Sequence, residues 1–428
     1  KLIKETIILC LQYIYFRLYK LYMKKKIIAV FTGNRAEYGL QYPLLKAIEA
    51  HPDLDYKLLV SGAHLDDGLG NTLKEIQADG FHIDYEIEIE MGEDSEISTS
   101  RAIGSGILSI SEALKDAKPD IMVVYADRFE GFAAVIASTQ MNIPTAHIEG
   151  GDLTEGGALD DSVRHAMSKL SHIHFTTNQK ATNRVLAMGE EEWRVHTVGF
   201  PAIDSILDEC YATPDEISKK LLLDLGSPIV LFTQHSITTE FEQSMEQIAP
   251  SLDAMKSLAK QGVQVILTYP NNDAGGQKII EELNKIKSEL IDNIQIHKSL
   301  GRHLYHGILA LARDSELRVA CVGNSSSGVK ETPAFGCPAV NIGSRQKGRL
   351  RGSNVIDTDY DKIEIFNAVR ECFDDKEFRL QCFLTNNPYY AGGAGKKMAK
   401  ILAETKLDKI LIRKKMTLKG DVKDGWYQ

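Results

Sequence analysis

The sequence predicts an α/β protein built from two Rossmann-like, doubly wound domains that face each other across a cleft. Three observations lead to this prediction. The chain of 428 residues is longer than one ordinary core accommodates. From Lys26 onward, short Val/Ile-rich runs alternate with longer helical patterns, as in a buried parallel sheet. A proline-rich stretch between Gly199 and Pro228 interrupts this alternation, and a second series of the same kind follows.

Each series supplies a set of expected strands. In the first series we expect strands at 26–31 (KIIAVF), 56–61 (YKLLVS), 121–127 (IMVVYAD), 145–150 (TAHIEG), 173–177 (IHFTT) and 195–199 (VHTVG). In the second series we expect strands at 228–234 (PIVLFTQ), 263–270 (VQVILTYP), 294–300 (IQIHKSL), 317–323 (LRVACVG) and 338–343 (PAVNIG). A helix is expected to start at Thr213-Pro214, since threonine caps helices and proline suits their first turn.

These patterns divide the chain. We expect an N-terminal domain over 23–205, a C-terminal domain over 206–385, a helix within 386–410 that returns to the first domain, and a polar tail over 411–428. The stretch 1–22 is apolar but carries Lys4, Glu5, Arg17 and Lys20, so its uncharged run is too short to span a bilayer. We interpret it as an upstream leader before a natural start at Met23.

Composition excludes several classes of function. The net charge of −9 gives no global attraction to nucleic acid or to an anionic membrane, so neither is an expected partner. Six cysteines lie without CxxC pairing or histidine partners at zinc spacing, which argues against a metal site or a disulfide scaffold. A reducing cytoplasm is the expected compartment.

Parallel sheets of this type bind ligands beyond the carboxyl ends of their strands. The first strand runs into Gly33-Asn34-Arg35, which puts a guanidinium at a helix N-terminus, where it suits a phosphate contact. A loop arginine paired with Glu37 is an equally good interpretation. The glycines do not form GxGxxG, so a nicotinamide dinucleotide is disfavoured.

Acidic residues gather at neighbouring strand ends of the first series. They occur as Asp127-Arg128, as Glu149 and Asp152 after His147, and as Asp160-Asp161 ahead of Arg164 and His165. A single acid at a strand end is commonly a helix cap. Grouped carboxylates instead shift one another's pKa values apart, which provides an acid and a base for moving protons to and from carbon and oxygen.

The second series ends two strands in polar residues. One strand ends in His235-Ser236 and another in Gly323-Asn324-Ser325-Ser326-Ser327-Gly328, with Glu331 shortly after. Small hydroxylated residues at the start of a helix offer N–H and O–H donors for a diphosphate, although a serine-rich cap is the ordinary interpretation of such a run. Glu331 lies near the same helix end, where its carboxylate suits ribose hydroxyls.

At these motifs the sequence resembles the hydrolysing UDP-N-acetylglucosamine 2-epimerases of bacterial sialic-acid pathways, relatives of the epimerase half of the animal bifunctional epimerase/kinase. The resemblance covers roughly 23–402. It rests on GNRAEYG, SGAHLDDGLGNT, PDIMVVYADRFE, IPTAHIEGGD, DDSVRHAMSKLSHIHFTT, TQHSITTE, YPNNDAG and GNSSSGVKETPAFGCPAVNIGSRQKGR. A looser likeness to GT-B glycosyltransferases supports a GT-B-like fold with a nucleotide cleft.

The resemblance implies that UDP leaves in an anti elimination after C2 deprotonation, and that water adds to the glycal to give N-acetylmannosamine. It implies catalytic roles for Asp127, Glu149, Asp160 and His235. It implies UDP contacts from Arg35, His235, Asn324, Ser325, Ser326, Gly328 and Glu331, and sugar contacts from His64, Asp67, Arg128, His147 and Arg164. It implies a UDP-sugar as substrate, a homodimer or homotetramer, and neither metal nor redox cofactor.

Two departures from the family pattern leave the sugar open. The segment DLTEGGAL before Asp160 is about two residues longer than the usual form, and NNPYYAGGAGKK replaces the usual pattern near the C-terminus. UDP-2,4-diacetamido-2,4,6-trideoxyglucose, as in legionaminic-acid synthesis, is the rival substrate. The motifs also leave open a non-hydrolysing epimerase, a GT-B glycosyltransferase and a catalytically silent UDP-sugar sensor.

Overall fold

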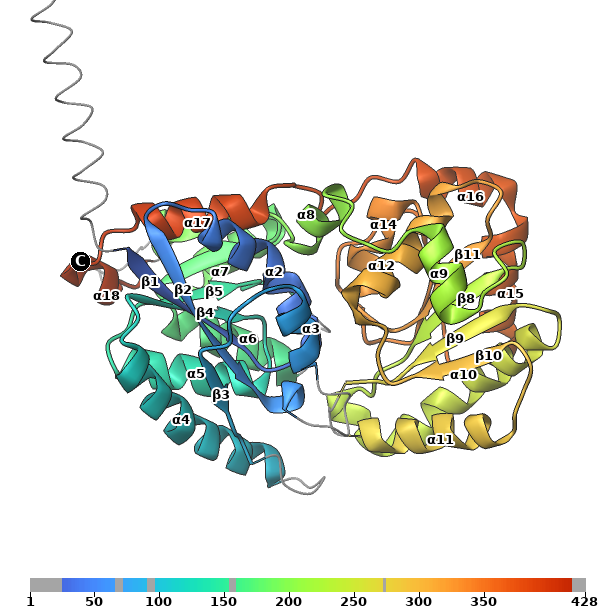
Figure 1. The fold of residues 1–428 in the computed structure, drawn as a ribbon, viewed down its shortest axis with the longest axis horizontal. Helices are drawn as coiled ribbons and strands as arrows, with labels where there is room; N and C mark the ends of the chain where they lie inside the picture. Colours follow the sequence, from blue (N-terminus) through green and yellow to red (C-terminus); the bar gives the residue numbers. More distant parts are fainter. Residues whose placement is uncertain (1–24, 66–71, 91–96, 154–158, 272–274, 418–428) are drawn as a thin grey trace, which may run out of the picture.

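A computed structural model describes residues 25–65, 72–90, 97–153, 159–271 and 275–417. It contains two parallel sheets, each with helices on both faces, side by side in one elongated molecule (Figure 1). The first sheet has the order β3-β2-β1-β4-β5-β6-β7, with bounds β1 Lys26–Thr32, β2 Leu54–Ser61, β3 Tyr85–Ile87, β4 Ile121–Tyr125, β5 Thr145–Ile148, β6 Ile173–Thr176 and β7 Val195–Thr197. The second has the order β10-β9-β8-β11-β12-β13, with bounds β8 Ile229–Thr233, β9 Gln264–Thr268, β10 Ile294–His297, β11 Val319–Gly323, β12 Ala339–Ile342 and β13 Val355–Thr358.

The central strands of the first sheet bury both faces, which explains their unbroken apolar sequences. In β4, Ile121 and Val123 join one core while Met122 and Val124 join the other, because successive side chains point to opposite faces. The helices around this sheet are α2 Arg35–Glu49, α3 Leu73–Ala78, α4 Ser98–Ala117, α5 Phe129–Gln140, α6 Leu159–Leu170 and α7 Gln179–Ala187. Helices α4, α5 and α6 contribute to one core, and α2 and α3 contribute to the other.

The second sheet is built in the same way. Its strand β8 alternates Val230 and Phe232 in one core with Ile229 and Leu231 in the other. Its helices are α9 Pro214–Leu221, α10 Ser244–Ala259, α11 Gly276–Ser288, α12 Gly301–Ala310, α13 Ser327–Lys330, α14 Thr332–Phe335, α15 Lys362–Asp374 and α16 Lys376–Phe383. The expected start of α9 is confirmed, since the Thr213 hydroxyl accepts the N–H of Glu216. The two-domain α/β fold is therefore as predicted.

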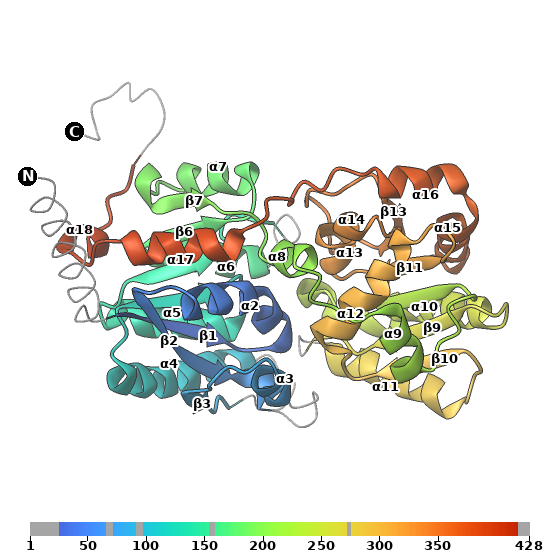
Figure 2. The same ribbon diagram turned by 45° about the horizontal axis from the view of Figure 1, so that its top comes forward.

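The chain crosses between the two sheets twice. Helix α8 (Ala202–Leu207) lies on the first crossing, and we propose the domain boundary between residues 205 and 206. After α16 the chain returns, and α17 (Ala394–Glu404) lies across the first sheet beside α2 (Figure 2). Its Met398 and Leu402 are fully buried in the core of that sheet. The first domain is thus completed by residues from the end of the chain.

Two edge strands were not expected from the sequence. Strand β3 has three residues, two of them at least partly exposed, and β13 has no fully buried residue. Short edge strands lack the apolar runs that mark central strands. The expected leader at 1–22 lies outside the described residues. The first residues of the expected tail are anchored, since Leu411 of α18 (Lys409–Ile412) is buried in the core and the Thr417 N–H donates to the Gly189 carbonyl.

Candidate active site

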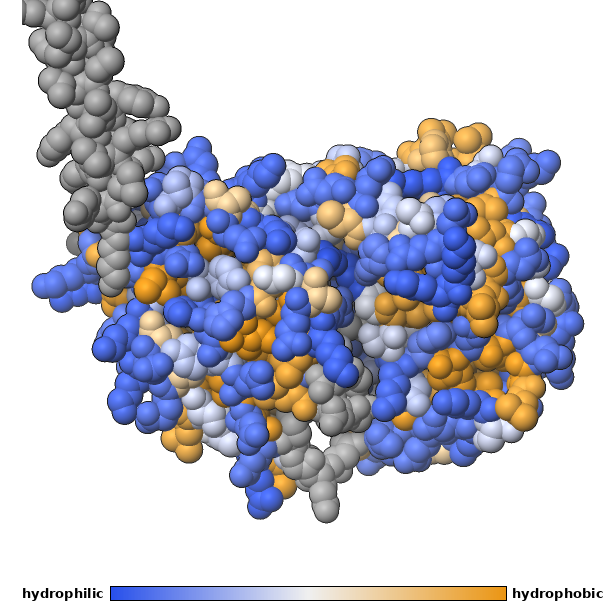
Figure 3. Space-filling view, in the orientation of Figure 1, coloured by the Kyte–Doolittle hydropathy of each residue, from blue (hydrophilic) through white to orange (hydrophobic). Residues whose placement is uncertain are grey.

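The site lies where the strand order of each sheet reverses direction. In the first sheet β1 and β4 are neighbours, and in the second β8 and β11 are neighbours, so the connections on either side lead away from each other. Such switch points leave a crevice at the carboxyl ends of the strands. Both crevices open toward the boundary between the domains, where the molecular surface is hollowed (Figure 3).

Asp127 follows β4 and is held by an arginine. Arg164, on α6, donates to the carboxylate of Asp127, to Asp161 Oδ1 at 2.6 Å and to the Asp152 carbonyl at 2.8 Å. Burial lowers the pKa of Arg164 to about 9, which still leaves it charged at neutral pH. Arg164 thereby holds the Asp127 carboxylate at the carboxyl end of β4, and a guanidinium favours the ionised form of a neighbouring carboxylate.

Glu149 follows β5 and is held from both sides. The Tyr125 hydroxyl donates to one carboxylate oxygen, and the ammonium of Lys330 contacts the other. The same ammonium lies 2.6 Å from Asp152 Oδ2. Glu149 has φ of 69°, a left-handed conformation that a residue other than glycine adopts only at a cost. The turn sets the backbone of Glu149, and the contacts with Tyr125 and Lys330 orient its carboxylate.

Three further residues predicted for the site, Asp160, Arg128 and His64, also lie in the first domain. Asp160 lies in the first turn of α6, about one helical turn ahead of Arg164. Arg128 lies 3.4 Å from Glu130 Oε2, so it pairs with a carboxylate in the first turn of the helix that it precedes. His64 is fully buried, with its nitrogens 3.0 Å from the Thr32 hydroxyl and 2.6 Å from the Thr72 hydroxyl.

Two predicted residues cannot be placed in this way. Asp67 falls outside the described residues, and the side chain of Arg35 is likewise outside them. Glu37 Oε2 accepts the N–H of Gly33 at 2.8 Å. Burial raises the pKa of Glu37 to about 8, with the neighbouring Glu130 adding to the effect, so Glu37 is mostly neutral at pH 7.

His147 supports the site from behind. It is fully buried, with Nε2 2.7 Å from the Ala126 carbonyl and Nδ1 3.0 Å from the Ser168 hydroxyl. Burial lowers its pKa to about 3. Since a carbonyl only accepts, Nε2 carries the proton and Nδ1 accepts from the serine. His147 therefore fixes the backbone directly ahead of Asp127, and its predicted contact with the sugar stays a prediction.

A cavity of about 180 Å³ lies between the domains. Gly39 and Leu40 of α2 and Ala202 of α8 line one side. The second domain lines the other side with His235, Ser325, Ser326, Glu331, Arg302, His306 and Arg345, among others. Four of the residues predicted to bind the nucleotide, namely His235, Ser325, Ser326 and Glu331, thus line one cavity.

His235 lines that cavity, and Asn324 behind it bonds the His235 backbone. The side chain of Asn324 accepts the backbone N–H of His235 at 2.6 Å and donates to the backbone carbonyl of His235 at 2.8 Å. The His235 Nδ1 accepts the N–H of Asn271 at 3.0 Å, so the proton of the neutral ring is on Nε2. The imidazole therefore carries its donor at Nε2, on the side of the ring away from Asn271.

The match with a protein-family model decides the family. Residues 46–403 match the model described as UDP-N-acetylglucosamine 2-epimerase. The chain belongs to this family. A UDP-N,N'-diacetylbacillosamine 2-epimerase (hydrolyzing) of Legionella pneumophila is 36% identical over 83% of this chain and 91% of that protein. A UDP-N-acetylglucosamine 2-epimerase of Neisseria meningitidis serogroup B is 34% identical over 81% of this chain and 87% of that protein.

Solved structures of the family share the fold. A UDP-GlcNAc 2-epimerase from Neisseria meningitidis, bound to UDP-GlcNAc, superposes with a TM-score of 0.72 at 20% identity, covering 89% of this chain and 100% of that one. A UDP-GlcNAc 2-epimerase from Methanocaldococcus jannaschii, in complex with UDP-GlcNAc and UDP, gives a TM-score of 0.69 at 16% identity, covering 88% and 99%. At these identities the likeness concerns the fold alone.

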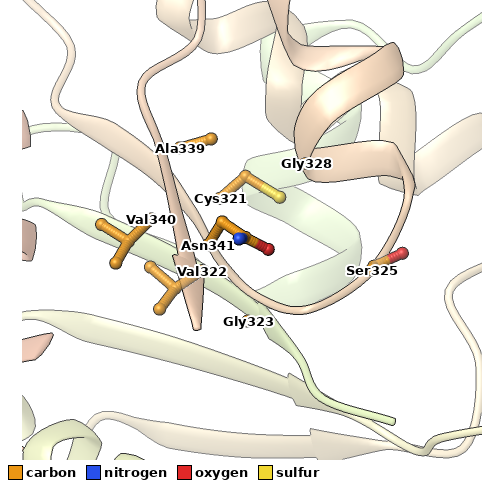
Figure 4. A pocket seen from close by; sticks show the side chains of 8 residues that line it. All are labelled: Cys321, Val322, Gly323, Ser325, Gly328, Ala339, Val340 and Asn341. Carbon is orange, nitrogen blue, oxygen red and sulfur yellow. The ribbon is translucent and has the colours of Figure 1, made fainter. Parts of the chain in front are cut away.

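The serine-rich loop of this family member turns polar groups toward the cleft. Figure 4 shows β11 ending at Gly323, with Ser325 on the loop that follows and Gly328 on α13. Gly323 has φ of 126°, and a Cβ there would lie 2.0 Å from the Thr233 carbonyl oxygen, so glycine is required. The hollow between Cys321, Asn341 and this loop is too narrow for a water molecule, whereas Ser325 also lines the larger cavity.

Several site residues were not singled out from the sequence. Lys330 stands beside Glu331 in GNSSSGVKE, but the sequence pattern indicates no role for it. Arg302 and His306 lie on α12, far in the sequence from any motif, and His306 Nε2 lies 2.7 Å from Glu331 Oε2. Among the described residues, we find no cluster of three potential metal ligands and no helix long and apolar enough to cross a bilayer.

Proposed function

We propose that this protein is a hydrolysing UDP-N-acetylglucosamine 2-epimerase that converts UDP-GlcNAc and water to N-acetylmannosamine and UDP. The observation that carries this proposal has two parts: Asp127 and Glu149 follow two adjacent strands at the carboxyl edge of the first sheet, and His235, Ser325 and Glu331 line a cavity between the domains. Proton-transferring carboxylates in one domain and a polar cavity for the nucleotide at the other are what C2 epimerisation with loss of UDP requires.

The reaction divides between the domains. One carboxylate takes the C2 proton, the C2–H electron pair forms a C1=C2 double bond, and the C1–O bond to UDP breaks. Water then adds its oxygen to C1 while a proton returns to C2 from the opposite face. Asp127 and Glu149 are the proposed proton carriers, and Asp160 assists them.

The second domain receives the leaving group. We propose that His235 Nε2–H, Ser325, Ser326 and the N–H groups around Gly328 stabilise the departing diphosphate, supported by the position of His235, Ser325 and Ser326 in one cavity. Asn324 orients His235, and Glu331 is proposed for the ribose hydroxyls. The remaining proposed contacts of phosphate or sugar are Arg35, His64, Asp67, Arg128, His147 and Arg164. Placement in a sialic-acid-type pathway, a cytoplasmic location, and assembly as a homodimer or homotetramer are parts of the same proposal.

A second substrate has specific support. The Legionella relative and a Campylobacter jejuni relative that is 34% identical over 83% of this chain are both named as hydrolysing 2-epimerases of diacetylbacillosamine nucleotides. The first carries UDP in its name and the second GDP or UDP. We therefore keep UDP-2,4-diacetamido-2,4,6-trideoxyglucose as the second candidate for the same chemistry.

An NMR time course in D2O tests the reaction. We expect UDP, the free 2-epimer and deuterium at C2 from at least one of the two UDP-sugars. The UDP-sugar with the higher kcat/KM is the preferred substrate. Return of an intact UDP-linked 2-epimer contradicts hydrolysis and supports a non-hydrolysing epimerase. Binding of both sugars without turnover supports the sensor, and acceptor-dependent transfer supports the glycosyltransferase.

A pair of aspartates that flank one strand supplies a variant and its control. Asp127→Asn, at the carboxyl end of β4, is expected to lower kcat about 10²- to 10⁴-fold, the range for loss of a proton-transfer group. Asp120→Asn changes the residue before the same strand, where the carboxylate accepts the Ile27 N–H at 2.8 Å on the opposite edge of the sheet. The control is expected to keep kcat within about threefold.

A further inference from the structure

Lys330 is a cation of the second domain buried among anions of the first. It is the last residue of α13, and 1% of its side chain is exposed. Its ammonium contacts the Glu149 carboxylate and lies 2.6 Å from Asp152 Oδ2. Both acceptors follow β5, so the lysine spans the boundary between the domains.

Aromatic rings also pack against the ammonium. The Phe200 ring lies 5.0 Å and the Tyr389 ring 5.3 Å from Nζ, both within the range of a cation–π contact. Phe200 lies on the first crossing of the chain between the sheets and Tyr389 on the second. Asn387 on the second crossing donates to the Lys330 carbonyl at 3.0 Å. Lys330 is thereby fixed where the two domains join.

Stability alone does not account for this arrangement. A buried ion pair costs the desolvation of each charge, and a well-packed apolar residue of similar size is often as stabilising or more so. Burial lowers the pKa of Lys330 well below its ordinary value, and the nearby Arg349 adds to that effect. A methionine would fill the same space between Phe200 and Tyr389 without these costs.

The lysine instead completes the hold on Glu149. Tyr125 donates to one oxygen of that carboxylate and Lys330 contacts the other, so the plane of the group is set by two domains together. The two carboxylates beside Lys330 favour its charged form against the effect of burial, and a charged Lys330 in turn favours the ionised form of Glu149. Arg349, from the same domain as Lys330, donates to the carbonyl of Leu153, the residue directly after Asp152, at 2.6 Å.

We propose that Lys330 is a positioning residue for the epimerase reaction, which holds Glu149 ionised and oriented for proton transfer when the two domains are joined. This inference rests on the proposed function. It assigns to the second domain a part in the proton chemistry as well as in nucleotide binding.

The test compares kcat with nucleotide affinity in Lys330→Met. We expect kcat to fall at least about 100-fold with the preferred UDP-sugar, while the Kd for UDP stays within about threefold, because Lys330 does not line the nucleotide cavity. Lys330→Arg keeps the charge and is expected to stay within about tenfold of the wild-type kcat. This rescue separates positioning from mere packing.

A second, charge-balanced variant keeps the test valid if Lys330→Met does not fold. Lys330→Met leaves Glu149 and Asp152 without their cation, whereas Lys330→Met with Asp152→Asn removes one charge of each sign and keeps the net charge of the cluster. The double variant is expected to fold and to remain at least about 100-fold impaired in kcat. Wild-type-like kcat in either folded variant overturns the proposal.

Lys414→Met is the matched control. Lys414 is also a mostly buried lysine beside a carboxylate, at 2.8 Å from Glu190 Oε2, but it lies with the C-terminal segment away from the cavity. Its loss is expected to lower stability and to leave kcat per folded molecule within about threefold. If wild-type protein turns over neither UDP-sugar, the proposed function fails. If wild type is active and Lys330→Met equals it, only the role of Lys330 fails.

Discussion

At the scale of single residues, the site depends on a histidine that titrates outside the neutral range. His147 is fully buried and bonds the carbonyl of Ala126, a residue with φ of 53°. That left-handed turn leads the chain into Asp127. Because burial lowers the pKa of His147 to about 3, the ring stays neutral in the folded protein through the whole mildly acidic range.

This histidine is expected to make folding pH-dependent below about pH 6.5, the ordinary pKa of histidine. Above that value neither state binds its proton. Below it, the histidine is protonated in the unfolded chain but stays neutral in the folded one. The free energy of unfolding therefore falls by about 1.4 kcal/mol per pH unit, which amounts to roughly 2 kcal/mol between about pH 7 and 5. Urea unfolding of wild type and His147→Gln at both pH values measures the difference.

The variant is expected to be less stable at neutral pH, since it loses the imidazole's bonds, but to lose about 2 kcal/mol less than wild type on going to about pH 5. Equal losses in the two proteins would contradict a neutral, buried His147. The comparison cancels the carboxylates that titrate in both.

At the scale of elements, α17 is capped by a residue that lies far earlier in the chain. Asp204, on α8, accepts the N–H groups of Gly393, Ala394 and Gly395 at 2.6, 3.0 and 2.8 Å. Such donors have no partners within their own helix, and a carboxylate also suits the positive end of the helix dipole. One side chain thus ties together the two crossings of the chain.

Asp204→Ala is expected to lower the free energy of unfolding by about 1–3 kcal/mol, because three donors beside a buried carboxylate lose their acceptor. Thermal and urea unfolding measure the loss. Asp361→Ala is the matched control, since Asp361 caps α15 through the N–H groups of Ile363 and Glu364 at the surface. Asp361→Ala is expected to lower the free energy of unfolding by less than Asp204→Ala does. A larger loss in Asp361→Ala would contradict the proposed importance of Asp204 for joining the two crossings.

At the scale of the whole molecule, Arg302 forms a second bridge between the domains. This arginine of α12 lies 3.4 Å from Asp79 Oδ2 and 3.2 Å from the Ser205 hydroxyl, and its guanidinium stacks 3.7 Å from the centre of the Tyr42 ring. The cavity that we assign to the nucleotide lies against this arginine. The bridge and the cavity therefore depend on the same domain arrangement.

Arg302→Ala is expected to favour a more open arrangement, because it removes contacts between α12 and the first domain. Small-angle scattering without ligand should show a larger radius of gyration, and KM should rise about tenfold with a smaller change in kcat. Arg313→Ala is the matched control, as Arg313 stacks on Tyr211 and Phe335 within the second domain. An unchanged radius and KM in Arg302→Ala would contradict the bridge.

The sequence indicated much of the site because its residues follow strands that are recognisable from their composition. Asp127, Glu149, His235 and Ser325 each come shortly after an apolar run, and parallel strands bring such ends to one edge. Arg302 and Lys330 carry no such signal. Each is an ordinary cation on a helix until the first domain supplies Asp79 or Glu149 as its partner.

By itself the sequence determined the two sheets, the place of the crevice and the family, since periodicity and strand-end motifs are local in the chain. The tertiary structure decided which charges meet. Lys330 lies 178 positions from Asp152, and Asp204 lies 189 from Gly393, so neither contact leaves a local pattern. Such pairs form only when separate parts of the chain pack against each other. Burial then removes the water that would otherwise solvate each charge, so each charged group needs a partner from the other part.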